Sequence, residues 1–254
     1  MKDADYKRYM QLISENLLDE ATDFRREIMP RYIYKFYSLT SKTGRGKTDK
    51  RTLDTLENSE IWCSKIEYFN DPYEGIGYYY ELDREIEIRL ADFLRIASFT
   101  EEAASNISMW AYYANNHRGF CVKYEVIDNS KLYDVNYIEL RESQKKLWIE
   151  AMKKCALGIA TDKEQLLIYE KYLTKHVSWS NEREYRIIWA TERDDEKGRS
   201  VKCDEIGLKP VQIYTGINCS SASKKRIAHI SRKLGCGEVV ECAIDENKFV
   251  LLNE

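Results

Sequence analysis

The sequence is poor in the patterns that mark metal sites, membranes and secretion. It has only three histidines, which are scattered, and its seven cysteines form no Cys-x-x-Cys pair, so a zinc site has little support. No stretch approaches the roughly 18 apolar residues that span a bilayer. The N-terminus is charged from Lys2 onward and lacks the apolar segment of a signal peptide. We therefore expect a cytoplasmic protein with no metal and no membrane partner.

An excess of charge of one sign is also missing. The chain has 40 Lys and Arg against 43 Asp and Glu, a net charge of −3, which disfavours a protein that binds nucleic acid through its overall charge alone. A basic stretch, Lys224-Lys225-Arg226 with Arg232-Lys233, is typical either of a nucleic-acid surface or of the solvated face of a helix. The odd number of cysteines, several of them in apolar runs, indicates reduced and mostly buried thiols.

Tyrosine, by contrast, is abundant, with 19 residues in a chain of 254. Tyrosine combines stacking with hydrogen bonding, so a tyrosine-rich cleft would suit a flat ligand such as a nucleobase or nicotinamide. Tyrosine also fills the faces of β-strands, and the composition does not separate the two interpretations. The length is enough to bury a core in one large domain or two small ones.

Hydrophobic spacing predicts irregularly interleaved helices and strands. The predicted helices cover residues 3–29, 51–58, 78–94, 101–115, most of 140–175, and 220–234. The predicted strands cover residues 31–37, 61–64, 96–100, 120–127, 132–138, 183–190, 200–206, 210–215, 239–243 and 248–252. This order predicts an α+β fold with a mixed, mostly antiparallel split sheet and flanking helices. We expect residues 1–30 to form an N-terminal helical extension and residues 31–254 a single catalytic domain.

The sharpest functional signal is the pair Glu182 and Glu184, two positions apart in a β-rich run. On a strand, side chains at i and i+2 point to the same face, so both carboxylates would share a face of an apolar strand. Such a pair is costly in a core unless the face opens on a cleft. Trp179, Tyr185 and Arg186 add aromatic and cationic neighbours. The alternative is that both carboxylates face water.

A second motif, Phe69-Asn70-Asp71-Pro72-x-Glu74, gathers an amide and two acids around a proline. It favours a turn in which Asn or Asp side chains bond the local backbone. A metal site at this motif is an alternative. A third interpretation places Asn70 in the lining of a ligand cleft.

Ordered motifs carry a first resemblance over residues 31–252. They are Tyr34-Lys35-x-Tyr37-Ser38, Trp62-x-Ser64, Phe69-Asn70-Asp71-Pro72-x-Glu74, Ser98-Phe99-Thr100, Met109-Trp110-x-x-Tyr113, His117-x-Gly119-x-Cys121-Val122 and Trp179-Ser180-x-Glu182-x-Glu184-Tyr185-Arg186. The set resembles a bacterial family catalogued as a domain of unknown function. Some members of that family accompany phage-defence or toxin–antitoxin genes. The resemblance implies an anti-phage or toxin effector, with an antitoxin as a candidate partner.

A more distant resemblance is to ADP-ribosyltransferases of the Arg-Ser-Glu kind. It rests on the order of a polar first strand, the Ser98-Phe99-Thr100 strand, the strand after Gly119, and the late Glu182-x-Glu184. The departure is at the first strand, where Tyr34-Lys35 stands in place of an Arg or His. The resemblance implies an ADP-ribosyltransferase-like fold and NAD as a substrate.

The same resemblance implies roles for individual residues. Glu184 would bind the ribose, and Glu182 would act on the acceptor nucleophile. The remaining NAD contacts would be Ser98 and Thr100 beside nicotinamide, Lys35 near phosphate, and Tyr37 or Tyr73 as a stacking ring, with Asn70 in the cleft. A carboxylate near the ribose stabilises the oxocarbenium-like state of nicotinamide departure.

The acceptor implied is a cellular macromolecule, with RNA or DNA favoured over protein. Two rival functions stay open at this point. One is a non-catalytic nucleotide-sensing or protein-binding module of the same fold, in which Glu184 is structural. The other is a nuclease effector that uses Asp71, Glu74 and a metal.

Overall fold

The computed structural model describes residues 3–40, 46–71, 73–74, 92–101, 106–139, 145–191 and 197–244. The chain divides by its internal contacts into two compact units. The first unit contains Met1–Met29, Cys63–Ala97 and Asn129–Arg199. The second unit contains Pro30–Trp62, Ser98–Asp128 and Ser200–Glu254. Because each unit is assembled from three separate segments, its core depends on contacts between residues far apart in the sequence.

The second unit is built on an antiparallel group of strands. β4 (Phe120–Val126) pairs on one side with β1 (Tyr32–Tyr37) and on the other with β10 (Leu208–Thr215), both antiparallel. β1 also pairs antiparallel with the end of β3 (Leu94–Thr100), where Tyr34 lies opposite Thr100. β11 (Val240–Glu241) joins β10 in parallel. The hydrogen-bonded order within this unit is therefore β11-β10-β4-β1-β3.

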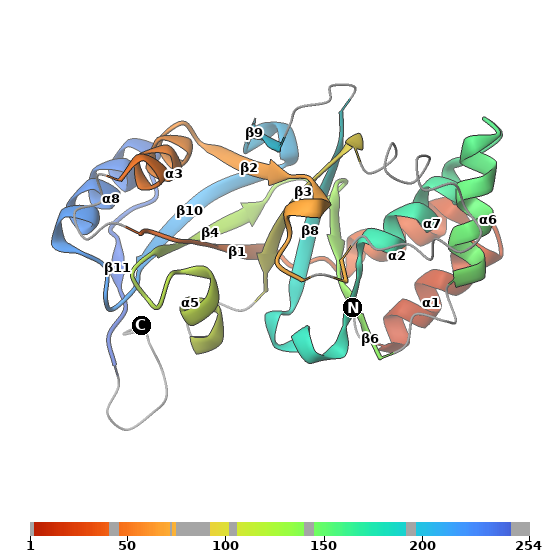
Figure 1. Ribbon diagram of the computed structural model, residues 1–254, viewed down its shortest axis with the longest axis horizontal. Coiled ribbons are helices and arrows are strands. Elements are labelled where there is room, and N and C mark those ends of the chain that lie inside the picture. Colours follow the sequence, from red (N-terminus) through yellow and green to blue (C-terminus); the bar gives the residue numbers. More distant parts are fainter. Residues whose placement is uncertain are drawn as a thin grey trace. The chain divides into compact units, whose positions relative to one another are not determined.

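The described α-helices of the second unit are α3 (Lys47–Glu57), α5 (Ile107–Tyr113) and α8 (Ser221–Leu234). α8 begins after Ser220, whose side chain accepts a hydrogen bond from the Ser223 amide, and it ends at Gly235 with φ 70°. A polar N-cap and a left-handed glycine at the C-terminal end are the usual helix boundaries. α8 buries Ile227 and Ile230 and contacts both α3 and β10 (Figure 1). A short 3-10 helix, η3 (Asp204–Ile206), precedes β10.

The first unit has four described α-helices, α1 (Asp3–Ser14), α2 (Leu18–Glu27), α6 (Lys145–Ala156) and α7 (Asp162–Tyr172). Their apolar faces share one core cluster whose members include Ile13, Met152 and Leu167. The unit also contains β5 (Leu132–Asp134), β6 (Asn136–Ile138), β7 (Thr174–His176) and β8 (Glu184–Ala190). β8 pairs with β5 and β3, and β6 pairs in parallel with β7.

Three described strands contribute residues to both units: β3, β2 (Glu60–Ser64) and β9 (Gly198–Lys202). β2 and β9 pair with each other. Ser64 of β2 also lies opposite Ile96 of β3 in an antiparallel arrangement. The first unit is completed by two 3-10 helices, η1 (Ile66–Tyr68) and η2 (Val177–Glu182). The second of these carries part of the candidate site.

The predicted fold class is confirmed: the protein is α+β, with mostly antiparallel strands and flanking helices. The predicted thiols are also confirmed, since all seven cysteines are free and six of them are buried. The division at residue 30 stays a prediction. No described helix combines the length and the apolar character needed to cross a membrane.

Several predicted elements are wrong in their extent. The single helix over residues 3–29 is two helices, because Asn16 adopts a left-handed φ of 64° between α1 and α2. The strand over residues 132–138 is β5 and β6, and the strand over 200–206 stops at Lys202 before η3. The stretch 140–175 ends in β7. Residues 78–91 of a predicted helix, and the predicted strand over 248–252, lie outside the described residues.

Candidate functional site

Glu182 and Glu184 do not lie on one strand. Glu182 is the last residue of the 3-10 helix η2, and Glu184 is the first residue of β8. Arg183 between them has φ 43° and ψ 56°, the left-handed conformation. The prediction that both carboxylates share a strand face is therefore wrong in its geometry. Both carboxylates nevertheless contact Lys175, one from each side of the left-handed Arg183.

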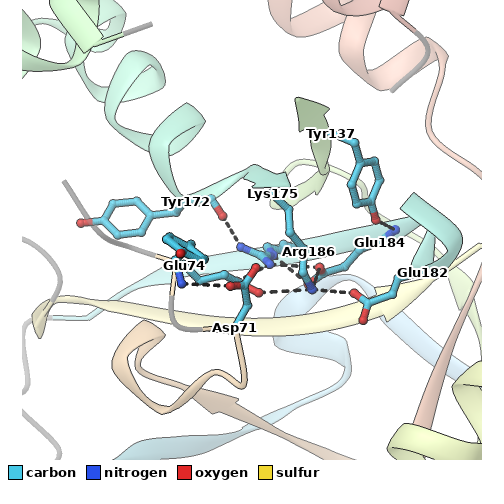
Figure 2. A network of polar contacts seen from close by, with 9 residues as sticks. Asp71, Glu74, Tyr137, Tyr172, Lys175, Glu182, Glu184 and Arg186 are labelled. Carbon is cyan, nitrogen blue, oxygen red and sulfur yellow. Dashed lines mark hydrogen bonds and ion pairs between the residues drawn. The ribbon is translucent and has the colours of Figure 1, made fainter. Parts of the chain in front are cut away.

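Lys175, on β7, lies among three carboxylates. Its Nζ is 2.5 Å from Glu182 Oε2, 3.2 Å from Glu184 Oε2 and 3.2 Å from Glu74 Oε1. Figure 2 shows the ammonium group between these side chains. Its Nζ also lies 4.9 Å from the centre of the Trp179 ring, which belongs to η2. A cation at this distance from an indole face is attracted by the ring as well as by the acids.

Arg186 is the second cation of the site. It lies two positions after Glu184 on β8, and side chains at that spacing share a face. Its Nε donates to Glu184 Oε1 at 2.8 Å, and its Nη2 donates to Glu184 Oε2 at 3.0 Å and to Glu74 Oε2 at 2.5 Å. Its Nη1 donates to the Tyr172 carbonyl oxygen at 2.5 Å. The guanidinium therefore binds Glu184 through two nitrogens and ties β8 to the end of α7.

These side chains form a unit that we call the carboxylate cluster: Glu74, Lys175, Glu182, Glu184 and Arg186. Each member is at least nine-tenths buried, with Glu182 4% and Glu184 5% exposed. The alternative that both carboxylates face water is therefore wrong. Three acids against two cations leave one excess negative charge when all five groups are ionised. Buried charges are tolerated only when they are paired and hydrogen-bonded, as these are.

Burial and charge act in opposite directions on the cluster. Burial raises the pKa of Glu74, the Arg186 charge lowers it, and the Glu184 charge raises it further, so the net shift is upward. Burial lowers the pKa of Lys175 and of Arg186, but the surrounding carboxylates outweigh this and raise both. The two cations therefore stay charged throughout the physiological range. The upward shift in pKa makes protonation of the Glu74 carboxylate easier.

The Asp71 turn supplies Glu74 to the cluster. Asp71 Oδ1 accepts a hydrogen bond from the Tyr73 amide at 2.9 Å, and the Asp71 carbonyl accepts one from the Glu74 amide at 3.1 Å. The interpretation of this motif as a local turn is confirmed. Asn70 is exposed, and Tyr73 is 65% exposed. Within the described residues, no group of three or more His, Cys, Asp or Glu side chains is arranged to hold a metal ion.

The other predicted NAD contacts belong to the second unit. Lys35 Nζ donates to the Ser98 carbonyl oxygen at 2.9 Å and lies 5.2 Å from the centre of the Phe99 ring. Tyr37 shares a hydrogen bond of 2.7 Å with the Tyr124 hydroxyl. Thr100 is fully buried. The structure thus brings Lys35 to Ser98 in the second unit, while Glu182, Glu184, Asn70 and Tyr73 belong to the first.

Two contributors to the site were missed from the sequence. Lys175 is the central cation, and Tyr137 accepts a hydrogen bond from the Glu184 amide at 2.8 Å through its hydroxyl oxygen. The available signal for Lys175 was a single cation between Leu173 and Val177, just before the Trp179 motif. Tyr137 gives no such signal, because its partner is 47 positions away.

A family model described as "Protein of unknown function (DUF2971)" matches residues 109–187. The matched segment is less than a third of the 254 residues, and it runs from within α5 into β8. It contains Lys175, Glu182, Glu184 and Arg186 but not Glu74 or the Lys35 strand. No curated protein and no solved structure matches the chain. The chain is thus similar, over this segment, to a domain family whose function is unknown.

Proposed function

We propose that the protein is an NAD-dependent ADP-ribosyltransferase that modifies a cellular macromolecule, with Glu184 as the carboxylate that faces the ribose. The observation that carries this proposal is the fixed position of Glu184. The Arg186 guanidinium donates to both of its oxygens, from Nε at 2.8 Å and from Nη2 at 3.0 Å. A carboxylate held in this way is a preorganised negative charge, the feature that best stabilises a developing positive charge.

In the proposed reaction the bond between the ribose C1′ and the nicotinamide nitrogen breaks, and the electron pair leaves with neutral nicotinamide. Glu184 hydrogen-bonds the ribose 2′-hydroxyl while C1′ becomes oxocarbenium-like. The acceptor nucleophile then bonds to C1′ and gives its proton to Glu182, from which it passes to solvent. Water can also bond to C1′ and give its proton directly to solvent without Glu182, and NAD is then hydrolysed.

The proposal requires that NAD reach a cluster that is buried in this state. We propose that NAD displaces the Lys175 ammonium group. This group forms ion pairs with all three carboxylates, and the flexible lysine side chain, with its four rotatable bonds, allows it to move. The Arg186 guanidinium can then keep Glu184 in place. Asn70 and Tyr73, which belong to the same unit as Glu184, are proposed contacts to NAD, while the roles of Lys35, Tyr37, Ser98 and Thr100 of the second unit stay predictions.

The second candidate function is a non-catalytic binding module in which the cluster is purely structural. The observation that favours it is the low exposure of Glu182 and Glu184, at 4% and 5%. Ion networks of this kind are also found where no chemistry occurs. The metal-dependent nuclease is not favoured by a comparable observation. Glu74 is in ion-pair contact with Lys175 and Arg186, so a metal would compete with both cations.

The deciding experiment is release of nicotinamide from NAD by the purified protein. The wild type should release nicotinamide, and Glu184→Gln should lower the rate at least 100-fold, the equivalent of about 3 kcal/mol. The matched control is Glu74→Gln, which removes a charge from the same cluster and should retain most of the activity. Equal losses in both variants, or no release by the wild type, would reject the assignment in favour of the structural role.

The proposed biological role is that of a toxin in phage defence or a toxin–antitoxin pair, and it derives from the resemblance of the motifs. Expression of the wild type in bacterial cells should arrest growth, while Glu184→Gln should not. If the wild type and Glu184→Gln arrested growth equally at equal abundance, toxicity would not depend on the proposed transferase reaction.

A further inference from the structure

The second unit contains an open hollow beside α8, with a volume of about 750 Å³. It is lined by one face of α8 and by the segment that follows the helix. The lining residues are Lys224, Lys225, Ala228, Arg232, Gly235, Gly237, Glu238, Val239 and Glu241. The volume lies in the range of ligand sites, but the lining is charged instead of apolar.

The five cations of the basic stretch have different partners. Arg226 pairs with Asp54 at 2.5 Å and Lys233 pairs with Glu57 at 2.8 Å, and both acids belong to α3. These two cations, seven positions apart, therefore share the face of α8 that meets α3 (Figure 1). Their ion pairs connect α8 to α3, and neither residue belongs to the described lining of the hollow.

Lys225 and Arg232 have the same spacing but a different surrounding. They also lie seven positions apart and therefore share a face, which is the face that lines the hollow. Within the part of the chain that the structure describes, neither forms an ion pair, and both are exposed. The third cation of the lining, Lys224, is neutralised by Glu241 at 2.6 Å. The described lining also contains the acid Glu238, so its three cations exceed its two acids by one, and the cations without an ion pair among the described residues are Lys225 and Arg232.

The rest of the lining keeps the space between these two cations open. Ala228 lies between them along the helix and has the smallest side chain of the face. Gly235 and Gly237, which follow the helix in the lining, have φ of 70° and 75°, and a Cβ at either position would meet no atom within 4 Å. At 1.5 Å of rise per residue, the two cations are separated by about 10.5 Å along the axis. Two long flexible side chains at that separation can hold two anionic groups of one extended ligand.

We propose that this hollow binds the sugar-phosphate backbone of a nucleic acid, with Lys225 and Arg232 on neighbouring phosphates. A backbone offers regularly repeated charges and needs no apolar anchor. An acidic peptide would normally need a large buried anchor residue, and the lining offers only Ala228 and Val239 as apolar floor. Among the described lining residues none is aromatic, so these residues offer no ring for base stacking, and the recognition that they provide is independent of sequence. This inference rests on the proposed function only for the role of the bound strand, which would be the acceptor.

The test is binding of a fluorescent single-stranded oligonucleotide of mixed sequence, as RNA and as DNA, across a range of salt concentrations and without NAD. The double variant Lys225→Gln with Arg232→Gln should lower affinity roughly tenfold or more. It should also make the slope of log K against log salt shallower by about 1.4, which is about 0.7 for each lost phosphate contact of a single strand.

The matched control is Arg226→Gln with Lys233→Gln, which removes the same charge from the same helix at the same spacing. It should leave both the affinity and the salt slope close to wild type, because neither residue belongs to the described lining of the hollow. The fold should also be retained, since exposed ion pairs contribute little to stability. If both double variants lowered the affinity for the oligonucleotide equally, binding would depend only on the overall charge of the protein, and the proposal would be rejected. Competition by polyglutamate as strong as that by unlabelled oligonucleotide would indicate an acidic protein instead.

The design separates this proposal from the transferase assignment. Oligonucleotide binding is measured without NAD. If the protein binds the oligonucleotide but releases no nicotinamide from NAD, the transferase proposal is rejected and the binding proposal is not. If the wild-type protein releases nicotinamide but binds neither the RNA nor the DNA oligonucleotide, the binding proposal alone is rejected.

Discussion

Lys175 holds Glu182 at 2.5 Å, Nζ to Oε2, across the 3-10 turn η2. The same nitrogen lies 3.2 Å from Glu184, the first residue of the following strand. One cation therefore fixes the two carboxylates on either side of the left-handed Arg183. In the proposed reaction Lys175 is displaced, and the two acids then have different roles, Glu184 at the ribose and Glu182 at the acceptor nucleophile.

Glu182→Gln should abolish transfer to the acceptor while retaining NAD hydrolysis, because nicotinamide departure needs the ribose carboxylate whereas transfer also needs a positioned nucleophile. The measurement is the ratio of modified acceptor to released nicotinamide. Glu74→Gln, which alters the same cluster, should leave this ratio unchanged. Equal loss of hydrolysis and transfer in Glu182→Gln would mean that the two roles are not separate.

Lys175→Met should destabilise the protein by about 3–5 kcal/mol, because it leaves three buried carboxylates with one cation. The comparison is Lys154→Met, which removes an ion pair to Glu164 whose lysine side chain is 50% exposed. That change should cost about 0–1 kcal/mol. Urea unfolding of the two variants measures the difference, and equal small effects would show that the cluster charges are not held as tightly as their distances indicate.

Glu170 should make folding stability fall as pH rises from about 5.5 to 7.5. Burial, followed by the Asp134 charge, raises the pKa of Glu170 from 4.5 to about 8. Between these values the folded state binds more protons than the unfolded state, so this group costs about 1.4 kcal/mol of stability per pH unit as pH rises. Glu170→Gln removes that dependence, and its stability relative to wild type should therefore increase with pH.

The control for this pH dependence is Glu164→Gln. Hydrogen bonds from Lys154 and Thr161 lower the pKa of Glu164 to about 2, so the group is ionised in both states above pH 5.5. Its stability difference from wild type should be flat over the same range. A flat difference for Glu170→Gln as well would show that Glu170 is already ionised when folded.

Nicotinamide release should be unaffected by excess EDTA, because the proposed bond cleavage relies on a good leaving group and a fixed carboxylate. The control is addition of magnesium or manganese after chelation, which should not change the rate. Should EDTA abolish activity and a metal restore it, the nuclease alternative with Asp71 and Glu74 as ligands would move ahead.

The sequence by itself determined the features that depend on neighbouring residues. The Asp71 turn follows from side chains that bond the local backbone, and the α8 boundaries follow from Ser220 and Gly235. The mixed α+β class follows from hydrophobic spacing. The extent of the first helix was misjudged because apolar spacing continues across Asn16, where the backbone turns left-handed.

Only the tertiary structure decided which charges meet. Glu74 and Arg186 are 112 positions apart, and they lie together because the Asp71 turn and β8 belong to the same unit. Likewise, the division of the α8 cations between ion pairs and the hollow depends on where α3 packs, because Lys225 and Arg226 are adjacent in the sequence. Periodicity reports which side chains share a face of one element, whereas the charge that a side chain meets is set by the packing of elements that are distant in the chain.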